Sequence, residues 1–362
     1  MYGEHDYEVL TSAREGLQRQ VDHFGSKQRH DTDGYNIIPF GYCTYRNRSD
    51  DGKFAFNINT ISEKAIVSKF YPVFRFTNAN STFMAEFLNS SPRVKKKLSV
   101  LAVGTSQVVL SFEALKAAKF DLPCKDEQDK IAAFVECLNT RIENQRTLVA
   151  ALKKYKRGVV RTLLSPKHCS IKNVKWTTSR IGDIGTFIKG APLSKADISL
   201  EGIPFILYGE LYTTYNEVIS NVVRKTQASV DKQYYSQIGD VIIPTSGETP
   251  EEISTASCVM LPDIILAGDL NIYRCTQVDG RIMSYILNHV VNDRIARIAQ
   301  GKSVVHVQAA ELSKIEITYP DLFSQKTIIA ILAAISDRID QGNAELRLLH
   351  ELRKALLQKL FI

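Results

Sequence analysis

The stretch that decides the fold is LPCKDEQDKIAAFV at residues 122–135, because its outline returns as YPDLFSQKTIIAIL at residues 319–332. In both, a proline is followed by polar residues and then by apolar residues at helical spacing. A proline ahead of a polar first turn and an apolar stripe is a typical helix start. One helix start is therefore used twice, which indicates an internal repeat.

The register of this repeat extends well beyond the two stretches. Pro123 lies opposite Pro320, an offset of 197 residues, and the match continues without a gap as far as Phe361. It also extends backwards across residues 301–320. The sequence therefore predicts two units, each a globular part followed by a long helix.

The two units are not expected to be identical. Met1 falls opposite about residue 199, so the first unit has no counterpart for the second unit's opening at 171–198, which includes IGDIGTFIKG. Whatever lies upstream, this mismatch predicts an asymmetry between the two domains.

Both repeated helices carry apolar residues at heptad spacing. In each helix, eight of the ten a and d positions over five heptads are apolar. A strict 3.5-residue period over this length favours a coiled-coil seam, and chain length permits either direction of pairing. The predicted interface residues are Ile131, Val135, Leu138, Ile142, Leu152, Ile328, Leu332, Ile335, Ile339 and Leu349.

The seams are interrupted at equivalent places. Gln145 matches Gly342, and Lys156 matches Arg353. These positions either set the register of the helix pair or mark where partner subunits bind.

The ends of the helices also have sequence signals. Asp126 and Ser324 are candidate N-caps, and Pro166 cannot continue the first helix.

Composition bounds the class of protein. With 362 residues, 44% hydrophobic and 23% charged, the chain is typical of a soluble two-domain protein. Its longest apolar run, at 328–335, is far shorter than a membrane span, and the N-terminus does not resemble a signal peptide. The six cysteines form no C-x-x-C pair, which favours reduced thiols and a cytoplasmic location. A net charge of +7 permits an anionic partner.

The globular parts read as α+β. Short β-type runs such as GDVIIPT and LNIYRC alternate with turn signals, and residues 281–300 read as one amphipathic helix. The GKS at 301–303 lacks the preceding glycine of a P-loop, and the DGK at 51–53 reads as a turn. We find no set of nucleophile, base and orienting group and no metal-ligand spacing, so the pattern favours a binder with no catalytic or metal site.

Basic and polar residues recur near a Gly-x-Ser turn in both units. Arginine and lysine suit phosphates and guanine edges, and hydroxyl side chains suit either. For each single residue the alternative is a solvated helix face or a polar turn. The candidate DNA contacts are Tyr45, Arg46, Arg48, Lys53, Lys97, Thr105, Ser106, Lys189, Ser246, Lys302, Ser303 and His306.

The repeat, its two proline-led helices and the opening at Trp176 with IGDIGTFIKG resemble the specificity subunits of type I restriction–modification systems, over nearly the whole chain. The resemblance implies target-recognition domains at 1–122 and 166–319, and helices at 123–165 and 320–362 that pair as an antiparallel coiled coil. Each domain would read half of a split, asymmetric DNA site.

The resemblance also implies partners. Two modification subunits, which methylate adenine, and two restriction subunits, which are motor-nucleases, would join this non-catalytic chain on double-stranded DNA. S-adenosylmethionine, ATP and Mg would then be bound by those partners and not by this chain. The alternative is a scaffolding protein with two β-rich modules on a coiled coil. A stand-alone nuclease or methyltransferase is disfavoured by the missing motifs.

Overall fold

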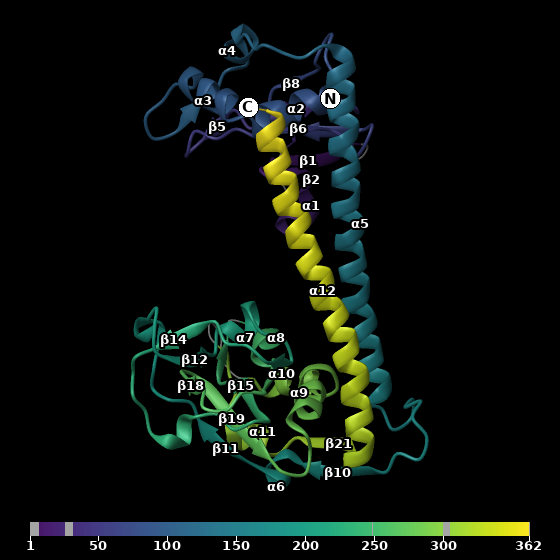
Figure 1. Cartoon of the computed structure of the whole chain (residues 1–362), viewed down its shortest axis with the longest axis vertical. Coiled ribbons are helices and arrows are strands. Elements are labelled where there is room, and N and C mark those ends of the chain that lie inside the picture. The colour runs from purple at the N-terminus through teal and green to yellow at the C-terminus, as the bar shows by residue number, and fades with distance from the viewer. Residues whose placement is uncertain (1–6, 26–31, 248, 300–304, 362) are drawn as a thin grey trace. The chain divides into compact units, whose positions relative to one another are not determined.

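The protein divides into two compact units, seen in the computed structural model in Figure 1, which describes residues 7–25, 32–247, 249–299 and 305–361. The first unit is Met1–Leu148 with Gly342–Ile362, and the second is Val149–Gln341. Each unit thus takes its globular part from one stretch of chain and its helices from two.

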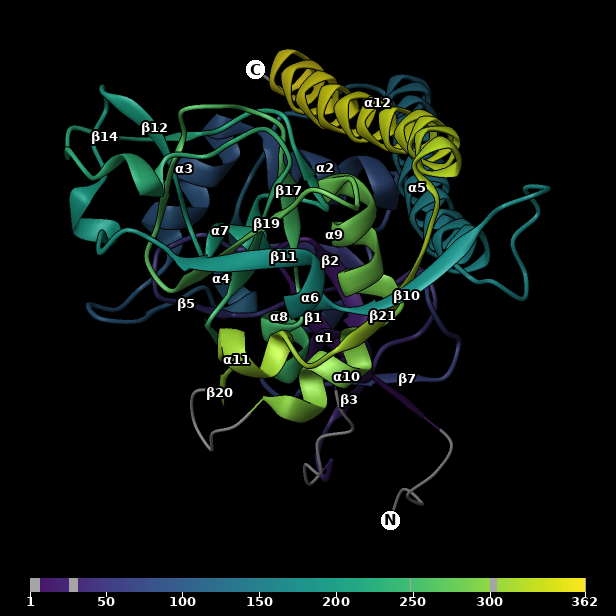
Figure 2. The same cartoon turned by 90° about the horizontal axis from the view of Figure 1, so that it is seen from below.

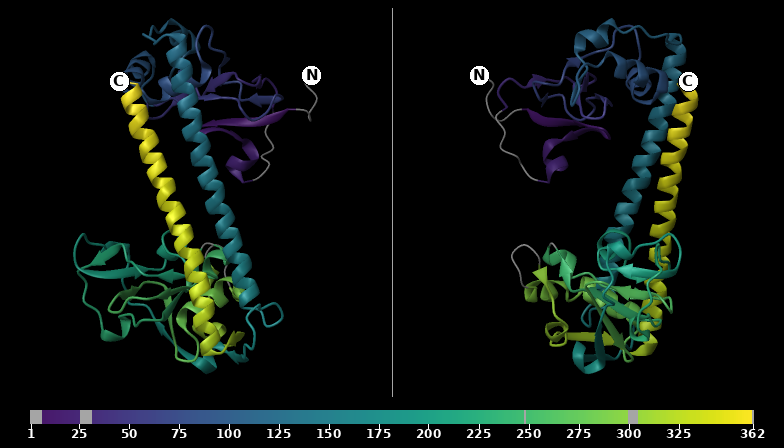
Figure 3. Two further views of the ribbon diagram at one scale, coloured as in Figure 1. Left: turned by 45° about the vertical axis from the view of Figure 1, so that its right-hand side comes forward. Right: turned by 90° about the vertical axis from the view of Figure 1, so that its left-hand side faces the viewer.

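Two helices of 39 residues each, α5 (Lys125–Leu163) and α12 (Leu322–Leu360), contribute to both units and pair antiparallel within each (Figures 1 and 3). In the first unit the start of α5 packs on the end of α12, where Val135 and Leu357 share one apolar cluster. In the second unit the end of α5 packs on the start of α12, where Val160 and Ile328 share another.

The predicted seam residues lie along these pairings. Six of them are buried: Val135, Ile142, Ile328, Leu332, Ile339 and Leu349. The other four are partly buried: Ile131, Leu138, Leu152 and Ile335. None of the ten side chains is exposed, as expected for positions a and d of a coiled coil.

Both predicted N-caps are wrong by a few residues. Helix α12 begins earlier than Ser324, and Asp321 caps it by accepting hydrogen bonds of 3.1 Å from the backbone N–H groups of Phe323 and Ser324. Helix α5 begins at Lys125, so Asp126 lies in its first turn, where its carboxylate interacts favourably with the helix dipole.

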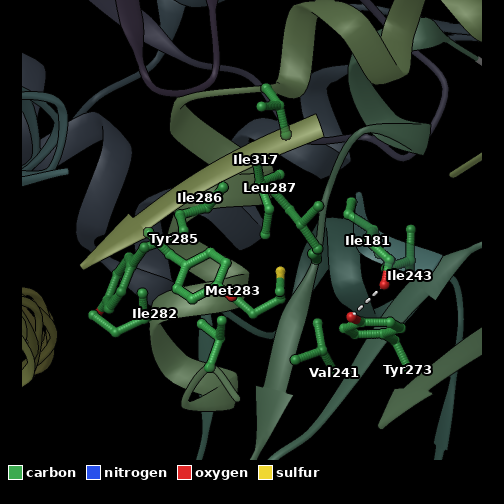
Figure 4. Close-up of a cluster of buried hydrophobic side chains, with 14 of the residues drawn as sticks. Ile181, Val241, Ile243, Tyr273, Ile282, Met283, Tyr285, Ile286, Leu287 and Ile317 are labelled. Carbon is green, nitrogen blue, oxygen red and sulfur yellow. Dashed lines mark hydrogen bonds between the residues drawn. The ribbon is translucent and has the colours of Figure 1, made fainter. Parts of the chain in front are cut away.

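The second unit is built around a five-stranded sheet with α9 (Gly280–His289) packed on it (Figures 2 and 4). Its strands, in spatial order, are β11 (Gly185–Lys189), β19 (Leu270–Cys275), β15 (Asp240–Pro244), β17 (Ser257–Val259) and β13 (Val218–Ile219). Figure 4 shows Tyr273 of β19 with its hydroxyl directed at the carbonyl of Ile181, at 2.8 Å.

Smaller elements complete this unit. A second sheet has the order β14 (Arg224–Thr226), β12 (Ile203–Leu207), β18 (Ile265–Ala267). Strand β10 (Trp176–Arg180) pairs with β21 (Glu316–Pro320), and β16 (Ser246–Gly247) pairs with β20 (Val305–His306). The short helices are α6 (Ile181–Ile184), α7 (Glu210–Thr213), α8 (Pro250–Ile253), α10 (Asn292–Ile298) and α11 (Ala309–Leu312), with 3-10 turns at Lys195–Asp197 and Lys232–Tyr234.

The segment predicted as one helix over 281–300 forms two, α9 and α10. The β-branched pair Val290 and Val291 leaves the helical ladder between them, and the N–H of Val291 donates back to the carbonyl of Ile286 at 3.0 Å. This break lets Val291 and Ile295 both face the core.

The first unit has a smaller three-stranded sheet in the order β6 (Phe56–Ile58), β4 (Cys43–Tyr45), β8 (Val73–Phe74). A second sheet has the order β2 (Gly16–Arg19), β1 (Glu8–Ala13), β7 (Ala65–Val67), β3 (Asn36–Ile37), and β5 (Arg48–Ser49) pairs with β9 (Val108–Val109). The helices are α1 (Gln20–Phe24), α2 (Ser81–Ser90), α3 (Pro92–Leu101) and α4 (Phe112–Ala117).

The repeat predicted from the sequence is visible in matching hydrogen bonds. The side-chain amide of Asn89, on α2, bonds both backbone groups of Phe56, at 2.9 and 2.8 Å. The amide of Asn288, on α9, bonds both backbone groups of Ala256 in the same way, at 3.1 and 2.6 Å. Strands β6, β4 and β8 therefore correspond to β17, β15 and β19. No helix in the described residues carries an apolar stretch of the length that crosses a bilayer.

Candidate DNA interface and its helical joint

Five of the predicted DNA contacts gather in the first unit on one surface, which we call the first ribbon and define as residues 46–53 and 104–109. Strands β5 and β9 form its ladder, with Arg48 opposite Val109. The side-chain amide of Gln107 donates to Asp50 at 3.0 Å and ties the two loops together. The predicted contacts on this ribbon, all exposed, are Arg46, Arg48, Lys53, Thr105 and Ser106.

The acidic turn of the first ribbon is satisfied within the protein. Asp51 accepts a hydrogen bond of 2.9 Å from the hydroxyl of Ser49 and pairs with Arg14 at 2.8 Å. The Ser49 hydrogen bond, together with those from Lys53 and Arg14, lowers the pKa of Asp51 to about 2. Gly52 adopts φ +71°, as the turn reading of this segment requires. The guanidinium of Arg48 lies 5.3 Å from the centroid of the Phe70 ring.

Tyr45 is wrongly predicted as a DNA contact. It ends the buried strand β4, is fully buried, and its hydroxyl donates to the carbonyl of Leu110 at 2.9 Å. Burial raises the pKa of Tyr45. A tyrosine ahead of a basic loop has the same sequence signal whether it ends the strand or begins the loop, and here it ends the strand.

Lys97 lies apart from the first ribbon. Its ammonium donates to the carbonyl of Lys119 and sits 5.1 Å from the centroid of the Phe120 ring. In the second unit Arg294 donates to the carbonyl of Glu316 at 3.0 Å in the same way. The repeated contact gives Lys97 a role in holding the segment that leads into α5.

The second unit has a matching pair of strands, β16 and β20, which we call the second ribbon (residues 246–247 and 305–306). His306 is exposed on it, opposite Ser246. Lys189, also exposed, ends β11 opposite Asn271, at the end of the sheet where β15 leads into β16. Lys302 and Ser303 lie outside the described residues.

Ser246 is wrongly predicted as a DNA contact. Its side chain is buried, and its hydroxyl donates to Asp269 at 2.8 Å. The hydroxyl of Tyr212 donates to the Ser246 carbonyl at 2.8 Å.

The two ribbons occupy equivalent places in their units. In the first, the N–H of Leu110 donates to the carbonyl of Asn47 at 2.9 Å. In the second, the N–H of Val307 donates to the carbonyl of Thr245 at 3.0 Å. Each ribbon therefore leaves its sheet at the same point of the fold.

A buried glutamine joins each globular part to its helix. Gln128 donates from its side-chain amide to the carbonyl of Pro123 at 2.9 Å and accepts from the N–H of Asn80, the N-cap of α2, at 3.0 Å. Gln325 does the same with Pro320 and with Asp279, the N-cap of α9, at 2.8 Å in both cases.

The seam interruptions are satisfied inside the units. Gln145 donates to the carbonyl of Gly342 at 3.0 Å, across the helix pair. Lys156 pairs with Glu217 at 2.8 Å and lies 5.3 Å from the ring centroid of Tyr285 on α9. Arg353 pairs with Glu86 on α2. The Gln145 contact crosses the helix pair and favours the register alternative there, whereas Lys156 and Arg353 join the helices to the globular parts.

The two carboxylates in these pairs differ in protonation behaviour. Burial alone would raise the pKa of Glu217, but hydrogen bonds from His289 and Lys156 outweigh it and lower the pKa to about 2. Burial also acts on Glu86, and there it outweighs Arg353, so the pKa of Glu86 is raised.

The arrangement offers exposed basic and hydroxyl side chains on paired ribbons. In the described residues, no group of three or more His, Cys, Asp or Glu side chains is placed to hold a metal ion. A family model described as the type I restriction modification DNA specificity domain matches residues 4–154 and again residues 173–348. The chain belongs to this family. The specificity-domain family supplies the non-catalytic subunits of type I restriction–modification systems that confer DNA sequence specificity.

Relatives and solved structures agree with this membership. The specificity subunit of the type I restriction enzyme MjaVIII from Methanocaldococcus jannaschii is 25% identical over 187 residues, which span 51% of this chain and 42% of the relative. The S subunit of a type I system from M. genitalium has the same fold, with a TM-score of 0.58 at 16% identity, over 98% of this chain and 88% of that one.

A second solved structure, of a type I R-M system described for its complex assembly and conformational transition, contains a chain with a TM-score of 0.57. Its identity is 18%, and the match covers 92% of this chain and 84% of that one. The specificity-domain fold thus extends over both units.

Proposed function

We propose that this chain is a DNA-binding specificity subunit that reads a bipartite, asymmetric site, one half with each unit. The observation that carries the proposal is the second copy of the whole domain, in which a ribbon leaves the sheet at the equivalent point. Two readers that differ in sequence suit a site with two different halves. The exposed Arg46 and Arg48 of the first ribbon suit phosphates and guanine edges.

The partners proposed for this subunit are two modification subunits and two restriction subunits. Apolar side chains that stay exposed on the long helices, Phe134, Leu148, Tyr155 and Leu348 among them, provide contact area for such partners. S-adenosylmethionine, ATP and Mg would be held by these partners, in the cytoplasm.

The first experiment is a methylome. The chain is expressed with its modification subunits in a host without other adenine methylation, and methylated adenines are mapped. We expect one split motif. Exchanging residues 7–121 for those of another specificity subunit should change one half of the motif and leave the other half. A motif that does not change, or no split motif at all, would remove the proposal.

The second experiment distinguishes DNA reading from scaffolding. The double variant Arg46→Glu and Arg48→Glu reverses two exposed charges on the first ribbon. We expect a weaker DNA affinity and a salt dependence whose slope falls by about one for each phosphate that is no longer neutralised. The double variant Lys130→Glu and Lys153→Glu, which also reverses two exposed charges but on α5, is the control. Equal weakening in both, or weakening in neither with assembly intact, favours the scaffold.

A further inference from the structure

The glutamines Gln128 and Gln325 are placed to do more than begin a helix. Both side chains are almost fully buried, at 4% and 1% exposure. Each amide uses its donor and its acceptor on two different backbone segments, which are the end of the globular part and the N-cap of an earlier helix, α2 or α9. A glutamine amide can donate and accept hydrogen bonds in one plane without carrying a charge.

A series of contacts connects the glutamine to the ribbon. The N-cap of α2, Asn80, is bonded to Gln128, and near the end of the helix the Asn89 amide bonds both backbone groups of Phe56 on β6. Strand β6 pairs with β4, where Phe56 lies opposite Tyr45. The hydroxyl of Tyr45 then reaches the carbonyl of Leu110, next to the first ribbon.

The second unit repeats this connection with different residues. Gln325 bonds Asp279 at the start of α9, and Asn288 on the same helix brackets Ala256, which precedes β17. Strand β17 pairs with β15, which leads into the second ribbon. Buried polar groups that are fully paired rigidify the elements they join.

We propose that Gln128 and Gln325 are positioning residues for half-site recognition, which fix the orientation of each ribbon on its long helix so that one spacing between the half-sites is read. The proposal rests on the proposed function for its consequence on DNA. Its structural part, a joint controlled by one amide, stands without DNA.

Hydrogen exchange of the purified full chain tests the structural part. In Gln128→Met the Asn80 N–H loses its acceptor, and we expect its exchange to accelerate at least tenfold while that of Asp279 stays unchanged. In Gln325→Met we expect the exchange of the Asp279 N–H to accelerate at least tenfold while that of Asn80 stays unchanged. A change below threefold at the matching N-cap overturns the proposal. In Gln128→Glu the acceptor is kept and the donor is removed, so Asn80 should stay protected.

Mapping of methylated adenines, in cells that also carry the modification subunits, tests the consequence. Wild type should methylate one spacer length. In Gln128→Met we expect sites one base pair longer or shorter to reach at least a tenth of the cognate frequency, with Gln128→Glu intermediate. Gln358→Met, the same change at an exposed position of α12, should match wild type.

The outcomes separate the two proposals. A wild type without a split motif removes the proposed function and leaves the exchange result valid. A wild type with a split motif whose spacer is unchanged in both methionine variants overturns the positioning role. Loss of all methylation in Gln128→Met that Gln128→Glu does not partly restore also overturns it, because a general folding role then explains the loss.

Discussion

The two units share their joint and differ at their sheet edges. In the second unit β11 covers the edge of β19, and β10 pairs with β21. In the described residues of the first unit β8, the counterpart of β19, pairs only with β4, and residues 119–123 form no strand. Leu122 is 39% exposed, whereas Tyr319, which lies opposite it in the repeat, is 5% exposed.

The comparison identifies the contacts that the described residues of both units share. Three sets of hydrogen bonds recur with matching distances although the surrounding residues differ. They are the bonds of Gln128 and Gln325, the bonds of Asn89 and Asn288, and the backbone bonds donated by Leu110 and Val307. Among the described residues, the covering strands β10 and β11 are found in the second unit. The recurring contacts all lie between the long helix and the ribbon, so the described residues of both units share that connection.

The largest test of the comparison is to remove the aromatic side chain under the covering strand. Tyr273→Ala should destabilise the second unit by about 3–5 kcal/mol, because the ring is fully buried and packs 4.7 Å from the ring of Phe187. Trp176 is the single tryptophan and lies on β10, so its fluorescence during urea unfolding reports this unit. Phe74→Ala, at the partly buried counterpart, should cost about half as much by hydrogen exchange. Equal costs would contradict the comparison.

The second test concerns the equivalent ion pairs. Lys156→Met should cost about 3 kcal/mol, because it leaves Glu217 charged in a buried site. Arg353→Met should cost less, because the Arg353 side chain is 26% exposed against 11% for Lys156. Urea unfolding followed at Trp176 measures the first, and hydrogen exchange at α2 measures the second. A larger cost for Arg353→Met would reverse the ranking.

Acid should change the stability of the two units in opposite directions through their buried glutamates. The folded pKa of Glu217, about 2, lies below its ordinary value of 4.5, so its contribution is complete above pH 4.5 and is lost as the pH falls toward 2. Between pH 7 and pH 3 this loss is about 2 kcal/mol. Glu86 has the opposite sign, since its raised pKa costs stability as the pH rises above 4.5. In Glu217→Gln the Trp176 signal should show a flatter acid dependence, and an unchanged slope would contradict this account.

The smallest effect is expected at the helix starts. Asp321→Ala removes the side-chain cap of α12 and should lower the melting temperature slightly. Cys124→Ala, at the residue before α5, should change it less, because there the backbone carbonyl of Cys124 accepts from Gln128. Differential scanning calorimetry of both variants compares them, and a larger drop for Cys124→Ala would contradict the assignment of the cap.

Much of the architecture could be predicted because repetition and heptad spacing are properties of the sequence itself. The two units and the seam follow from Pro123 opposite Pro320 and from the heptad spacing of the apolar residues. Burial of single polar residues could not be predicted. Tyr45 and Ser246 have the composition of contact residues, and only the strand that carries Tyr45 and the carboxylate at Asp269 show that both are internal.

The sequence repeat contains the two glutamines but does not indicate their role. Gln128 and Gln325 match in the repeat, yet their partners Asn80 and Asp279 lie 48 and 46 residues away and share no residue type. Because the contacts are to backbone N–H groups, no side-chain pattern at the partner signals them. Only the folded chain brings the amide to the N-cap.

The exchange of helix ends between units has a consequence for synthesis. Phe83 on α2 packs against Phe361, with ring centroids 5.6 Å apart, and Leu357 joins the same cluster. Domains ordinarily fold in the order in which they leave the ribosome. Here the first unit needs the end of α12 to complete its apolar cluster, although its globular part is synthesised first. The second unit needs only the start of α12. The apolar cluster of the second unit can therefore close before the cluster of the first unit that contains Phe361.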